Sequence, residues 1–453
     1  MLSLLQSKFA NRFGKDSRTL NIGVNSLLMF IIKCLSFLLS FISVPILIGS
    51  LDKTSYGIWL TLTSIVSWLS FCDVGLGHGV RNRIAEALAR NDFDSVKYYV
   101  SSGYFVLLLI SLTLILLTLL VGPLINWSAA LGASQSMNRE LTYLACFVIS
   151  LFLLNLSLKL IDSIFYAFQR PALGAVLSFL IQFFSVLSIY VMSKSGREFT
   201  LLHYGIILSG IPNIVTIIFT CCAFRLKYRK FVPSIHFVVR KYCNDIVLKG
   251  SQFFLVQITA IALFQTNNFV IAQCVNPAAV TDFNIAYKYY GIVGVIFSIL
   301  VAPLWSAATD AFHSKDYNWI FCTLKSLEKL YIFAIISLLF MFAISPFIYR
   351  FWLENMIVVN WEISILVLIY QVLSIRTGIY CAFLNGIGKI RLQFYFTFGE
   401  AILHIPLAIL LGNILGVAGV LISMCLMTFI NNIWEPMQLK KILTDKAYGV
   451  WGK

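Results

Sequence analysis

Residues 98–122 read YYVSSGYFVLLLISLTLILLTLLVG and carry no charged side chain. A helix needs about 20 mostly apolar residues to cross about 30 Å of hydrocarbon, so this stretch predicts a membrane-spanning helix. The whole chain shares its character, because 59% of the 453 residues are hydrophobic and 12% are charged. Ordinary soluble domains carry about 25% charged residues and cannot hide so much apolar surface from water. We therefore expect an all-α polytopic membrane protein.

Working outward from this stretch, twelve apolar segments can be drawn. They are 21–49, 55–72, 98–122, 141–168, 172–193, 202–224, 248–273, 284–309, 324–349, 362–386, 391–411 and 415–436. The first is too long for the h-region of a signal peptide, so we interpret it as a span. We expect two pseudo-symmetric six-helix lobes, at 1–225 and 248–453, joined by a basic cytoplasmic linker at 226–247.

The positions of the basic residues orient the chain. If the N-terminus lies in the cytoplasm and the spans alternate, 25 of the 34 Lys and Arg fall in cytoplasmic segments and 5 in outer segments. This bias follows the positive-inside rule and places both termini in the cytoplasm. The net charge of +15 is thereby explained by membrane orientation, so no nucleic-acid partner is expected.

Short matches between the two halves indicate a duplication. Tyr56-Gly57-Ile58 recurs as Tyr290-Gly291-Ile292, and Tyr166-Ala167-Phe168 resembles Cys381-Ala382-Phe383. The matches occur in the same order in both halves. This order favours a 6+6 transporter with its substrate path between the lobes.

Four cations within the predicted spans are counted with neither side of the membrane, and each charge at a helix centre costs about 2.5–3.5 kcal/mol. They are Lys33, Lys159, Lys288 and Arg376. Lys33 and Arg376 lie far from either water boundary and have no acid within one helical turn. We therefore expect both to line a polar cavity and bind substrate.

Lys288 and Lys159 allow two interpretations each. Lys288 is placed near the outer end of its predicted span, where it either snorkels to the interface or binds substrate. Lys159 lies three residues before Asp162 on one helix face, so these two side chains either neutralise each other or face a wet cavity. Asp162 is also a candidate for ion coupling.

Glu400 and His404 are spaced i, i+4 and share a face of the predicted span 391–411. A titratable pair at this depth is a candidate for proton or sodium coupling. The alternative is a satisfied polar contact between helices. The sequence contains no HExxH, GxSxG or Walker A motif, so we expect no metal, no cofactor and no enzymatic activity.

The segment from Val80 to Lys97 has apolar residues on one side and Arg81 and Arg83 elsewhere. This pattern predicts an amphipathic helix on the inner membrane surface, with the two arginines near anionic headgroups. The alternative interpretation is a basic anchor that only orients the chain.

Four local motifs carry a resemblance to a known family. They are Val44-Pro45-Ile46-Leu47, Tyr56-Gly57-Ile58-Trp59, Asp73-Val74-Gly75-Leu76-Gly77 and Arg81-Asn82-Arg83-Ile84-Ala85-Glu86-Ala87. With these motifs the chain resembles the O-antigen flippases, the polysaccharide-transporter branch of the MOP superfamily that also holds the MATE drug exporters. The length and the two six-span halves extend the resemblance to the whole chain.

The resemblance implies a MATE-like fold with a central cavity lined by cations, to which we match Lys33 and Arg376. It implies transfer of an undecaprenyl-diphosphate-linked oligosaccharide from the inner to the outer leaflet of a bacterial inner membrane. Membrane lipids, and the polymerase and chain-length regulator of the same lipopolysaccharide pathway, are the implied partners.

Two other functions remain open. A cation-coupled drug or metabolite antiporter of the MATE type needs acids in its cavity, whereas cations outnumber acids at depth here. A membrane enzyme of the same polysaccharide pathway usually needs a sizeable loop domain or an acidic metal site, whereas the predicted outer loops are short.

Overall fold

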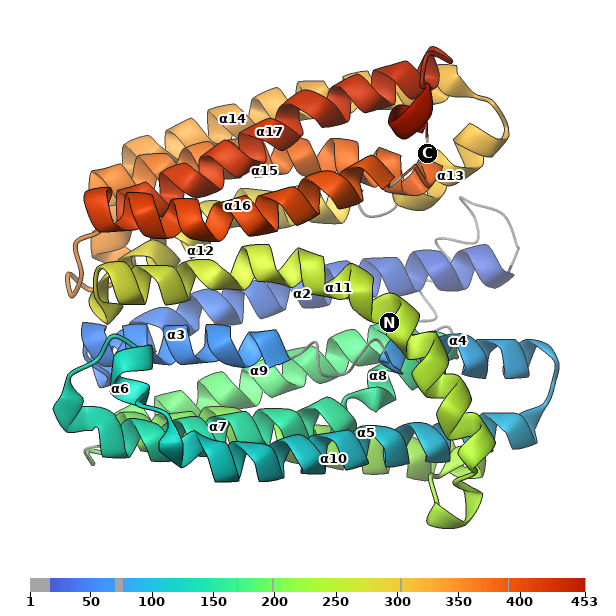
Figure 1. The fold of residues 1–453 in the computed structure, drawn as a ribbon, viewed down its shortest axis with the longest axis horizontal. Helices are drawn as coiled ribbons and strands as arrows, with labels where there is room; N and C mark the ends of the chain where they lie inside the picture. Colours follow the sequence, from blue (N-terminus) through green and yellow to red (C-terminus); the bar gives the residue numbers. More distant parts are fainter. Residues whose placement is uncertain are drawn as a thin grey trace. The chain divides into compact units, whose positions relative to one another are not determined.

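The computed structural model describes residues 17–69, 76–168, 170–197, 199–301, 304–389 and 391–452, and their side chains except at 17–27, 78, 89, 249–265, 305, 306, 309, 310, 313 and 452. All regular secondary structure in these ranges is helical (Figure 1). The predicted all-α class is therefore confirmed. Asp73-Val74-Gly75, part of one resemblance motif, lies outside the described residues.

The contacts divide the chain into two compact units. The first contains the chain up to Leu51 and Ile65–Ile258, and the second contains Asp52–Ser64 and Thr259–Lys453. The segment 52–64, which contains most of the helix Lys53–Trp68, is thus part of the second unit. The division into lobes at 1–225 and 248–453 stays a prediction.

The helices of the first unit follow from its long apolar runs. They are α2 (Ser17–Ser50), α4 (Leu76–Ala89), α5 (Phe93–Val121), η2 (Gly122–Leu124), α6 (Trp127–Ala130), η3 (Gln135–Met137), α7 (Asn138–Leu158), α8 (Leu160–Ala167), α9 (Pro171–Lys194), α10 (Leu201–Leu226), η4 (Arg229–Phe231) and η5 (Ile235–Phe237). Within this unit α7 packs against α5 and α10, while α9 packs against α2 and α10.

The second unit contains α12 (Pro277–Val301), α13 (Leu304–His313), α14 (Tyr317–Trp352), α15 (Trp361–Ile387), α16 (Arg391–Leu415), α17 (Val417–Leu443) and η6 (Gly449–Gly452). Its central helix is α15, which packs against α12, α13, α14 and α17. Two helices are shared between the units: α3 (Lys53–Trp68) and α11 (Arg240–Cys274).

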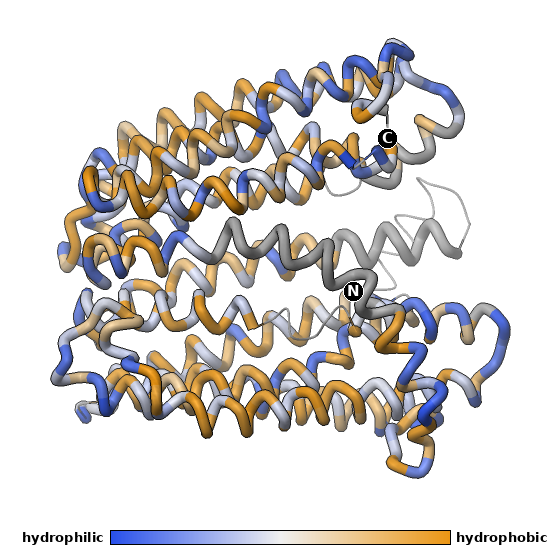
Figure 2. Tube along the Cα trace, in the orientation of Figure 1, coloured by the Kyte–Doolittle hydropathy of each residue, from blue (hydrophilic) through white to orange (hydrophobic). Residues whose placement is uncertain are grey.

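Ten helices in the described part of the chain are long and apolar enough to cross a membrane. They fall on ten of the twelve predicted spans; the other two, 55–72 and 248–273, fall on α3 and α11. Figure 2 shows mostly hydrophobic residues along α14 to α17, with hydrophilic residues most evident at the side of this unit near the C-terminus. The chain is therefore a multi-pass membrane protein, with about the number of spans expected.

Two predicted spans differ from the structure in their bounds or continuity. The span 141–168 is formed by α7 and α8, because the chain leaves the α-helical hydrogen-bond pattern at Lys159. The span 284–309 was placed too late, since α12 begins at Pro277 and ends at Val301. Hydropathy locates apolar runs, but a helix break inside such a run depends on local packing.

The helix predicted from Val80 to Lys97 is wrong in its extent, because α4 ends at Ala89. Asn91 adopts a positive φ of 56°. Asp92 then caps α5 by accepting a hydrogen bond from the backbone N–H of Ser95 at 3.0 Å. An N-cap of this kind starts a new helix in a new direction.

The apolar side of α4 faces protein. Val80 and Ile84 are 0% exposed and belong to a core cluster that includes Val100 on α5 and Ile161 on α8. The apolar pattern that predicted burial in the inner membrane surface therefore arises from packing inside the first unit. Arg81 and Arg83 remain at the margin of this core.

The basic segment 226–247 is built into the first unit. The rings of Tyr228 and Phe231 are buried in the same core cluster as α4. The backbone N–H of Ser234 donates a hydrogen bond to Oγ of Ser101 on α5 at 3.2 Å. Its polar backbone groups and its aromatic rings thus both find partners, so the segment has a defined place in the fold.

The segment 52–64 is held in the second unit by direct contacts with α12. Lys53 Nζ lies 2.7 Å from Oδ1 of Asp282. A Cβ on Gly57 would lie 1.7 Å from the backbone oxygen of Pro277, so no side chain fits at this position. Glycine permits the two backbones to approach this closely.

Candidate functional site

The first unit contains a polar pocket of about 300 Å³ between α2, α8 and α9. Its polar lining consists of Lys33, Ser36, Asp162, Tyr166, Ser178 and Gln182. All of these residues lie in helices long and apolar enough to span a membrane. The pocket therefore provides polar groups at a depth where they cost free energy unless they serve a ligand or one another.

Lys33 is the positive charge of this pocket. Its side chain is exposed and has no hydrogen-bond or ion-pair partner among the described residues. Asp162 shares the pocket, and its Oδ1 is buried without a hydrogen-bond partner. A Cβ on Gly174 would lie only 2.9 Å from this oxygen, so α9 passes closely over the carboxylate.

Of the two interpretations of Lys159 and Asp162, a direct ion pair is not found among the described residues, although Lys159 lies within electrostatic range of the Asp162 carboxylate. The four ion pairs within the described ranges involve other residues. Lys159 is exposed at the turn between α7 and α8. Asp162 instead faces the pocket that contains Lys33.

Arg81 reaches the wall of the same pocket. Its guanidinium carbon lies 4.6 Å from the centre of the Tyr166 ring. A guanidinium over an aromatic face is a cation–π contact, which keeps the charge available to other ligands. Two basic residues predicted for different roles are thus found at one pocket, Lys33 in its lining and Arg81 on the ring of Tyr166.

Arg83 has a different environment. It donates hydrogen bonds to Asp245 on α11 and to Glu86, the latter at 2.8 Å. These contacts raise the pKa of Arg83 above its usual range. The hydrogen bond from Arg83 in turn lowers the pKa of Glu86. Arg83 therefore joins α4 to the start of α11, and its role at anionic headgroups stays a prediction.

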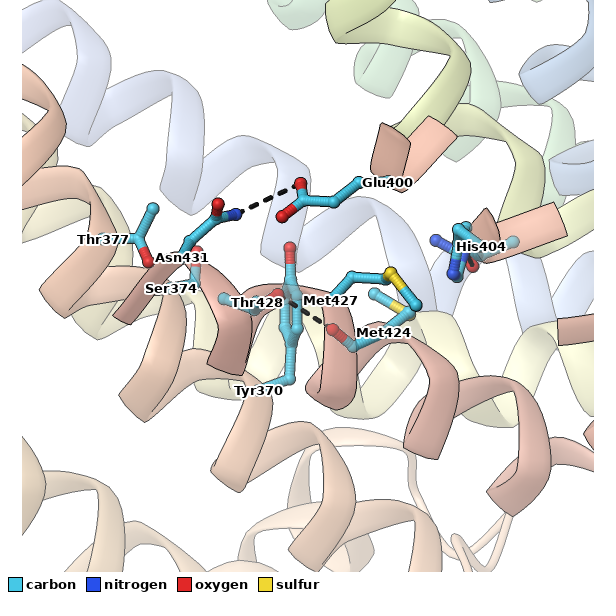
Figure 3. Close-up of a pocket in the computed structure, with 10 residues that line it drawn as sticks. Tyr370, Ser374, Thr377, Glu400, His404, Met424, Met427, Thr428 and Asn431 are labelled. Atoms are coloured by element: carbon cyan, nitrogen blue, oxygen red, sulfur yellow. Dashed lines mark hydrogen bonds between the residues drawn. The ribbon is translucent and has the colours of Figure 1, made fainter. Parts of the chain in front are cut away.

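The second unit contains a smaller polar pocket of about 90 Å³ (Figure 3). It lies between α11, α15, α16 and α17, and its lining includes Asn267, Tyr370, Glu400, His404, Thr428 and Asn431. A water molecule occupies about 30 Å³ of liquid, so the pocket has room for a few waters or one ion. Drug-sized ligands usually need about 300–1,000 Å³.

Glu400 and His404 both line this pocket, as their shared helix face predicted, but they bond to different partners. Oε2 of Glu400 accepts a hydrogen bond from Nδ2 of Asn431 at 3.2 Å, drawn in Figure 3. Nε2 of His404 lies 2.9 Å from Oδ1 of Asn267, and Nδ1 lies 2.9 Å from Oγ of Ser423. The histidine is therefore satisfied on both sides.

The carboxylate of Glu400 retains bonding capacity. It is 6% exposed, and its Oε1 has no hydrogen-bond partner within the described part of the chain. A second acid, Glu435, is 2% exposed and also has an oxygen without a partner. Glu435 lies within electrostatic range of Glu400 and of Arg376. Sequence reasoning missed Glu435, although its position inside the predicted span 415–436 was an available signal.

Arg376 is held by neutral groups of the second unit. Its NH1 donates to the backbone oxygen of Asn432 at 3.1 Å, and its guanidinium lies 5.3 Å from the centre of the Tyr380 ring. Both contacts leave the positive charge without a bonded counterion. Lining of a substrate cavity by Arg376 stays a prediction.

Lys288 lies near the middle of α12, not near its end, because the helix starts earlier than predicted. The side chain is half-buried and has no hydrogen-bond or ion-pair partner among the described residues. Snorkelling from the helix end therefore no longer accounts for it.

The chemistry of the two pockets differs. The first presents Lys33, with Arg81 stacked on its Tyr166, and these two positive charges suit an anionic ligand. The second presents a carboxylate, hydroxyls and amides around a small volume and suits a proton or a small cation. Within the described ranges, no group of three or more His, Cys, Asp or Glu is arranged to hold a metal ion.

The fold is that of the MATE transporters. A multidrug resistance MATE family transporter of the MOP superfamily in an inward-facing conformation superposes with a TM-score of 0.71 and 16% identity, covering 93% of this chain and 100% of that one. A MOP superfamily transporter from Pyrococcus furiosus, whose binding pocket is described as having reverse polarity, superposes with a TM-score of 0.61 and 15% identity over 93% of this chain and 96% of that one. The predicted MATE-like architecture is confirmed.

Residues 22–308 match the family of polysaccharide biosynthesis proteins, and the chain belongs to this family. It is 22% identical to a putative O-antigen export protein of Yersinia pseudotuberculosis, over 79% of this chain and 82% of that protein. It is 24% identical to a putative O-antigen transporter of Salmonella typhimurium, over 59% of this chain and 60% of that protein. The family resemblance inferred from the motifs between Val44 and Ala87 is confirmed.

Proposed function

We propose that this protein is a flippase for a lipid-linked oligosaccharide, an O-antigen or related repeat unit, in the assembly of a surface polysaccharide. The substrate is an undecaprenyl-diphosphate-linked oligosaccharide that moves from the inner to the outer leaflet of a bacterial inner membrane. The observation that carries the proposal is the family match over residues 22–308, together with the curated relatives that are named as O-antigen transporters.

The polar pocket of the first unit supports an anionic substrate. Lys33 has no counterion of its own, and Arg81 is held over Tyr166 with its charge available. A diphosphate carries negative charge that these residues can bind. Lys159, Lys288 and Arg376 are further cations in this proposal, because none forms an ion pair in the described structure.

The physical need for such a protein is clear. Moving one sugar hydroxyl into hydrocarbon without a hydrogen-bond partner costs about 2–7 kcal/mol, and an oligosaccharide carries many hydroxyls. A polar, cationic path lowers this barrier while the lipid tail stays in the bilayer. A membrane potential of 100 mV, inside negative, favours outward movement of negative charge, and moving two such charges outward gains about 4–5 kcal/mol. The membrane potential therefore contributes to export.

The pocket of the second unit supports a coupling role for Glu400. Its volume suits a proton or a sodium ion with little water, and the free Oε1 of Glu400 supplies an acceptor. His404 is fixed by Asn267 and Ser423 and shapes this pocket. Asp162 is a second coupling candidate, in the pocket of Lys33. Alternating access would link ion binding to movement of the substrate.

In the proposed topology both termini lie in the cytoplasm and the helices form two six-helix lobes. The proposed partners are the polymerase and the chain-length regulator of the pathway. The distribution of Lys and Arg supports this orientation. Labelling of single cysteines introduced at the ends of α5 and α10 with a membrane-impermeant maleimide in whole cells tests it. The end of α5 should react from outside, and the end of α10 should react only after lysis.

Deletion of the gene in its host tests the function. We expect surface polysaccharide to disappear from gels, and complete lipid-linked repeat units to accumulate in membrane extracts analysed by mass spectrometry. The wild-type gene should restore the polymer, whereas the double variant Lys33→Ala and Arg376→Ala should not. Expression of each variant in the membrane fraction is the control.

Other outcomes point to the alternatives. Accumulation of incomplete repeat units would indicate a sugar-adding enzyme of the pathway. Unchanged polymer and unchanged lipid intermediates would overturn the flippase proposal, and a cation-coupled drug antiporter would then be tested by export of organic cations.

A further inference from the structure

A long slot lies on the first unit, between the second half of α5 and the first half of α7. Its volume is about 1020 Å³, more than three times that of the pocket around Lys33. Its walls include Ile115 and Leu119 on α5 and Phe147 and Leu151 on α7. Leu119 and Phe147 are more than half exposed. An apolar, open surface at this depth is covered by lipid in a bilayer.

The length of the slot matches one leaflet. It extends along α7 from Arg139 to Leu151, which is about 18 Å at the helical rise of 1.5 Å per residue. Half of a hydrocarbon core of about 30 Å is about 15 Å. The slot therefore has room for the acyl chains of one leaflet, with a few ångströms left for the headgroup.

The mouth of the slot is basic and rich in donors. Arg139 is exposed and forms no hydrogen bond or ion pair with the described residues. Its place in the first turn of α7 adds the positive end of the helix dipole. Asn138 accepts a hydrogen bond from the backbone N–H of Ser128 through Oδ1 at 3.0 Å, which leaves its amide N–H groups free to donate. Glu140, the acid of this turn, does not line the slot.

The segment after α5, next to the mouth of the slot, is held by side-chain contacts. The indole N–H of Trp127 donates to the backbone oxygen of Gly122 at 2.8 Å, and the Trp127 side chain is buried. A Cβ on Gly122 would lie 2.6 Å from Sγ of Cys146, so the end of α5 sits directly on α7. A mouth fixed in this way loses little conformational entropy when a headgroup binds.

We propose that this slot is a binding site for one anionic glycerophospholipid. The phosphate binds Arg139 and the amide of Asn138, and the acyl chains lie between α5 and α7 along Leu119 and Phe147. With the proposed orientation of the chain, the lipid belongs to the outer leaflet. The site shares no lining residue with either polar pocket, so it does not depend on the identity of the transported substrate.

Native mass spectrometry of the purified full-length protein tests the proposal. The protein is exchanged into detergent with equal amounts of phosphatidylglycerol and phosphatidylethanolamine, and the retained lipids are counted. We expect phosphatidylglycerol to be preferred. Arg139→Gln should lower this preference by about fivefold, as expected for one basic side chain beside an anionic headgroup. Arg350→Gln is the matched control, because Arg350 is another exposed arginine in the terminal turn of a long helix, α14, and should leave the preference unchanged.

A second variant tests the acyl-chain part of the slot. Ser150 lines the slot, and its Oγ is buried without a hydrogen-bond partner. Ser150→Trp should fill the slot and reduce the number of retained lipids by one, whichever headgroup is offered. Size-exclusion chromatography confirms that the variant is folded.

Two results would overturn the proposal. Equal retention of the two lipids by the wild-type protein would identify only a general lipid annulus. An equal effect of Arg139→Gln and Arg350→Gln would show that any surface arginine contributes and that the slot is not a site. Neither result depends on polysaccharide export, so failure of this inference is distinct from failure of the proposed function.

Discussion

The two polar pockets of this protein differ in how far their polar groups are bonded to the protein itself. In the first unit, Lys33 is an exposed cation with no partner among the described residues, beside a carboxylate oxygen of Asp162 that also lacks one. In the second unit, His404 is 2% exposed and bonded on both ring nitrogens. The first pocket is about 300 Å³ and the second about 90 Å³. One pocket keeps bonding capacity for a ligand, and the other mostly satisfies itself.

The difference shows that a polar group at membrane depth can have either a structural or a functional role. A polar group at membrane depth is stable when its neighbours bond to it, and it is functional when they leave part of it free. In the first pocket Lys33 and Oδ1 of Asp162 have no hydrogen-bond partner among the described residues, whereas in the second Oε1 of Glu400 has none. Substitutions should therefore have different consequences in the two units.

The largest effect is expected from Lys33→Glu. The variant places two carboxylates in one pocket and reverses its sign toward an anionic substrate, so export should fall by at least about a hundredfold. The measurement is the rate at which surface polysaccharide reappears after induction in the deletion strain. Lys194→Glu, at the end of α9 and outside the pocket, should stay close to wild type. Similar export by both variants would remove the functional contrast between the pockets.

An intermediate effect is expected from Glu400→Gln. Glutamine keeps the contact with Asn431 but cannot bind or release a proton, and it binds cations weakly. Transport in vesicles should lose its response to an imposed proton or sodium gradient. At a typical coupling free energy, the stimulation of transport by the gradient should fall by about tenfold. A response to membrane potential should remain.

Glu362→Gln provides the comparison for this variant, because Glu362 is an exposed acid in the first turn of α15, outside the pocket. It should keep the response to the gradient. Loss of the response in both variants would mean that coupling does not depend on the pocket of Glu400.

The smallest effect on transport is expected from His404→Ala. This change leaves Asn267 and Ser423 without their buried partner, so the free energy of unfolding should fall by about 1–3 kcal/mol. Thermal unfolding in detergent measures the loss, and export below the melting temperature should change little. His236→Ala, on an exposed residue of η5, should not alter the melting temperature. A severe loss of export with unchanged stability would make His404 a functional residue rather than a structural one.

Much of the fold was readable from the sequence because the bilayer imposes a simple rule. Long apolar runs such as 98–122 must become helices, and α5 does so at Phe93–Val121. The end of α4 was missed, although Asn91 and Asp92 supply a residue suited to a positive φ followed by an N-cap. The predicted helix from Val80 to Lys97 was drawn from its apolar pattern alone, so these two local signals for a helix end were not used.

The candidate sites were readable only in part. The shared face of Glu400 and His404 followed from their spacing, because helical geometry is fixed. The partners Asn431 and Asn267 come from other helices, and no spacing within one helix reveals them. Lys159 and Asp162 were expected either to neutralise each other or to face a wet cavity, and Asp162 lines the pocket of Lys33 while Lys159 is exposed at the turn between α7 and α8. Side-chain partnerships across helices and at helix breaks depend on tertiary packing.

The close approach of Gly57 to Pro277 has a consequence for recombination between related proteins. Residues 52–64 lie in the N-terminal half of the chain, yet they belong to the unit formed by its C-terminal part. A chimera joined within 226–247 would combine the 52–64 segment of one parent with the α12 of the other. If the parent that supplies 52–64 has a residue other than glycine at position 57, its side chain would clash with the backbone oxygen at position 277 of the other parent. Functional hybrids should therefore require that 52–64 be exchanged together with the C-terminal half.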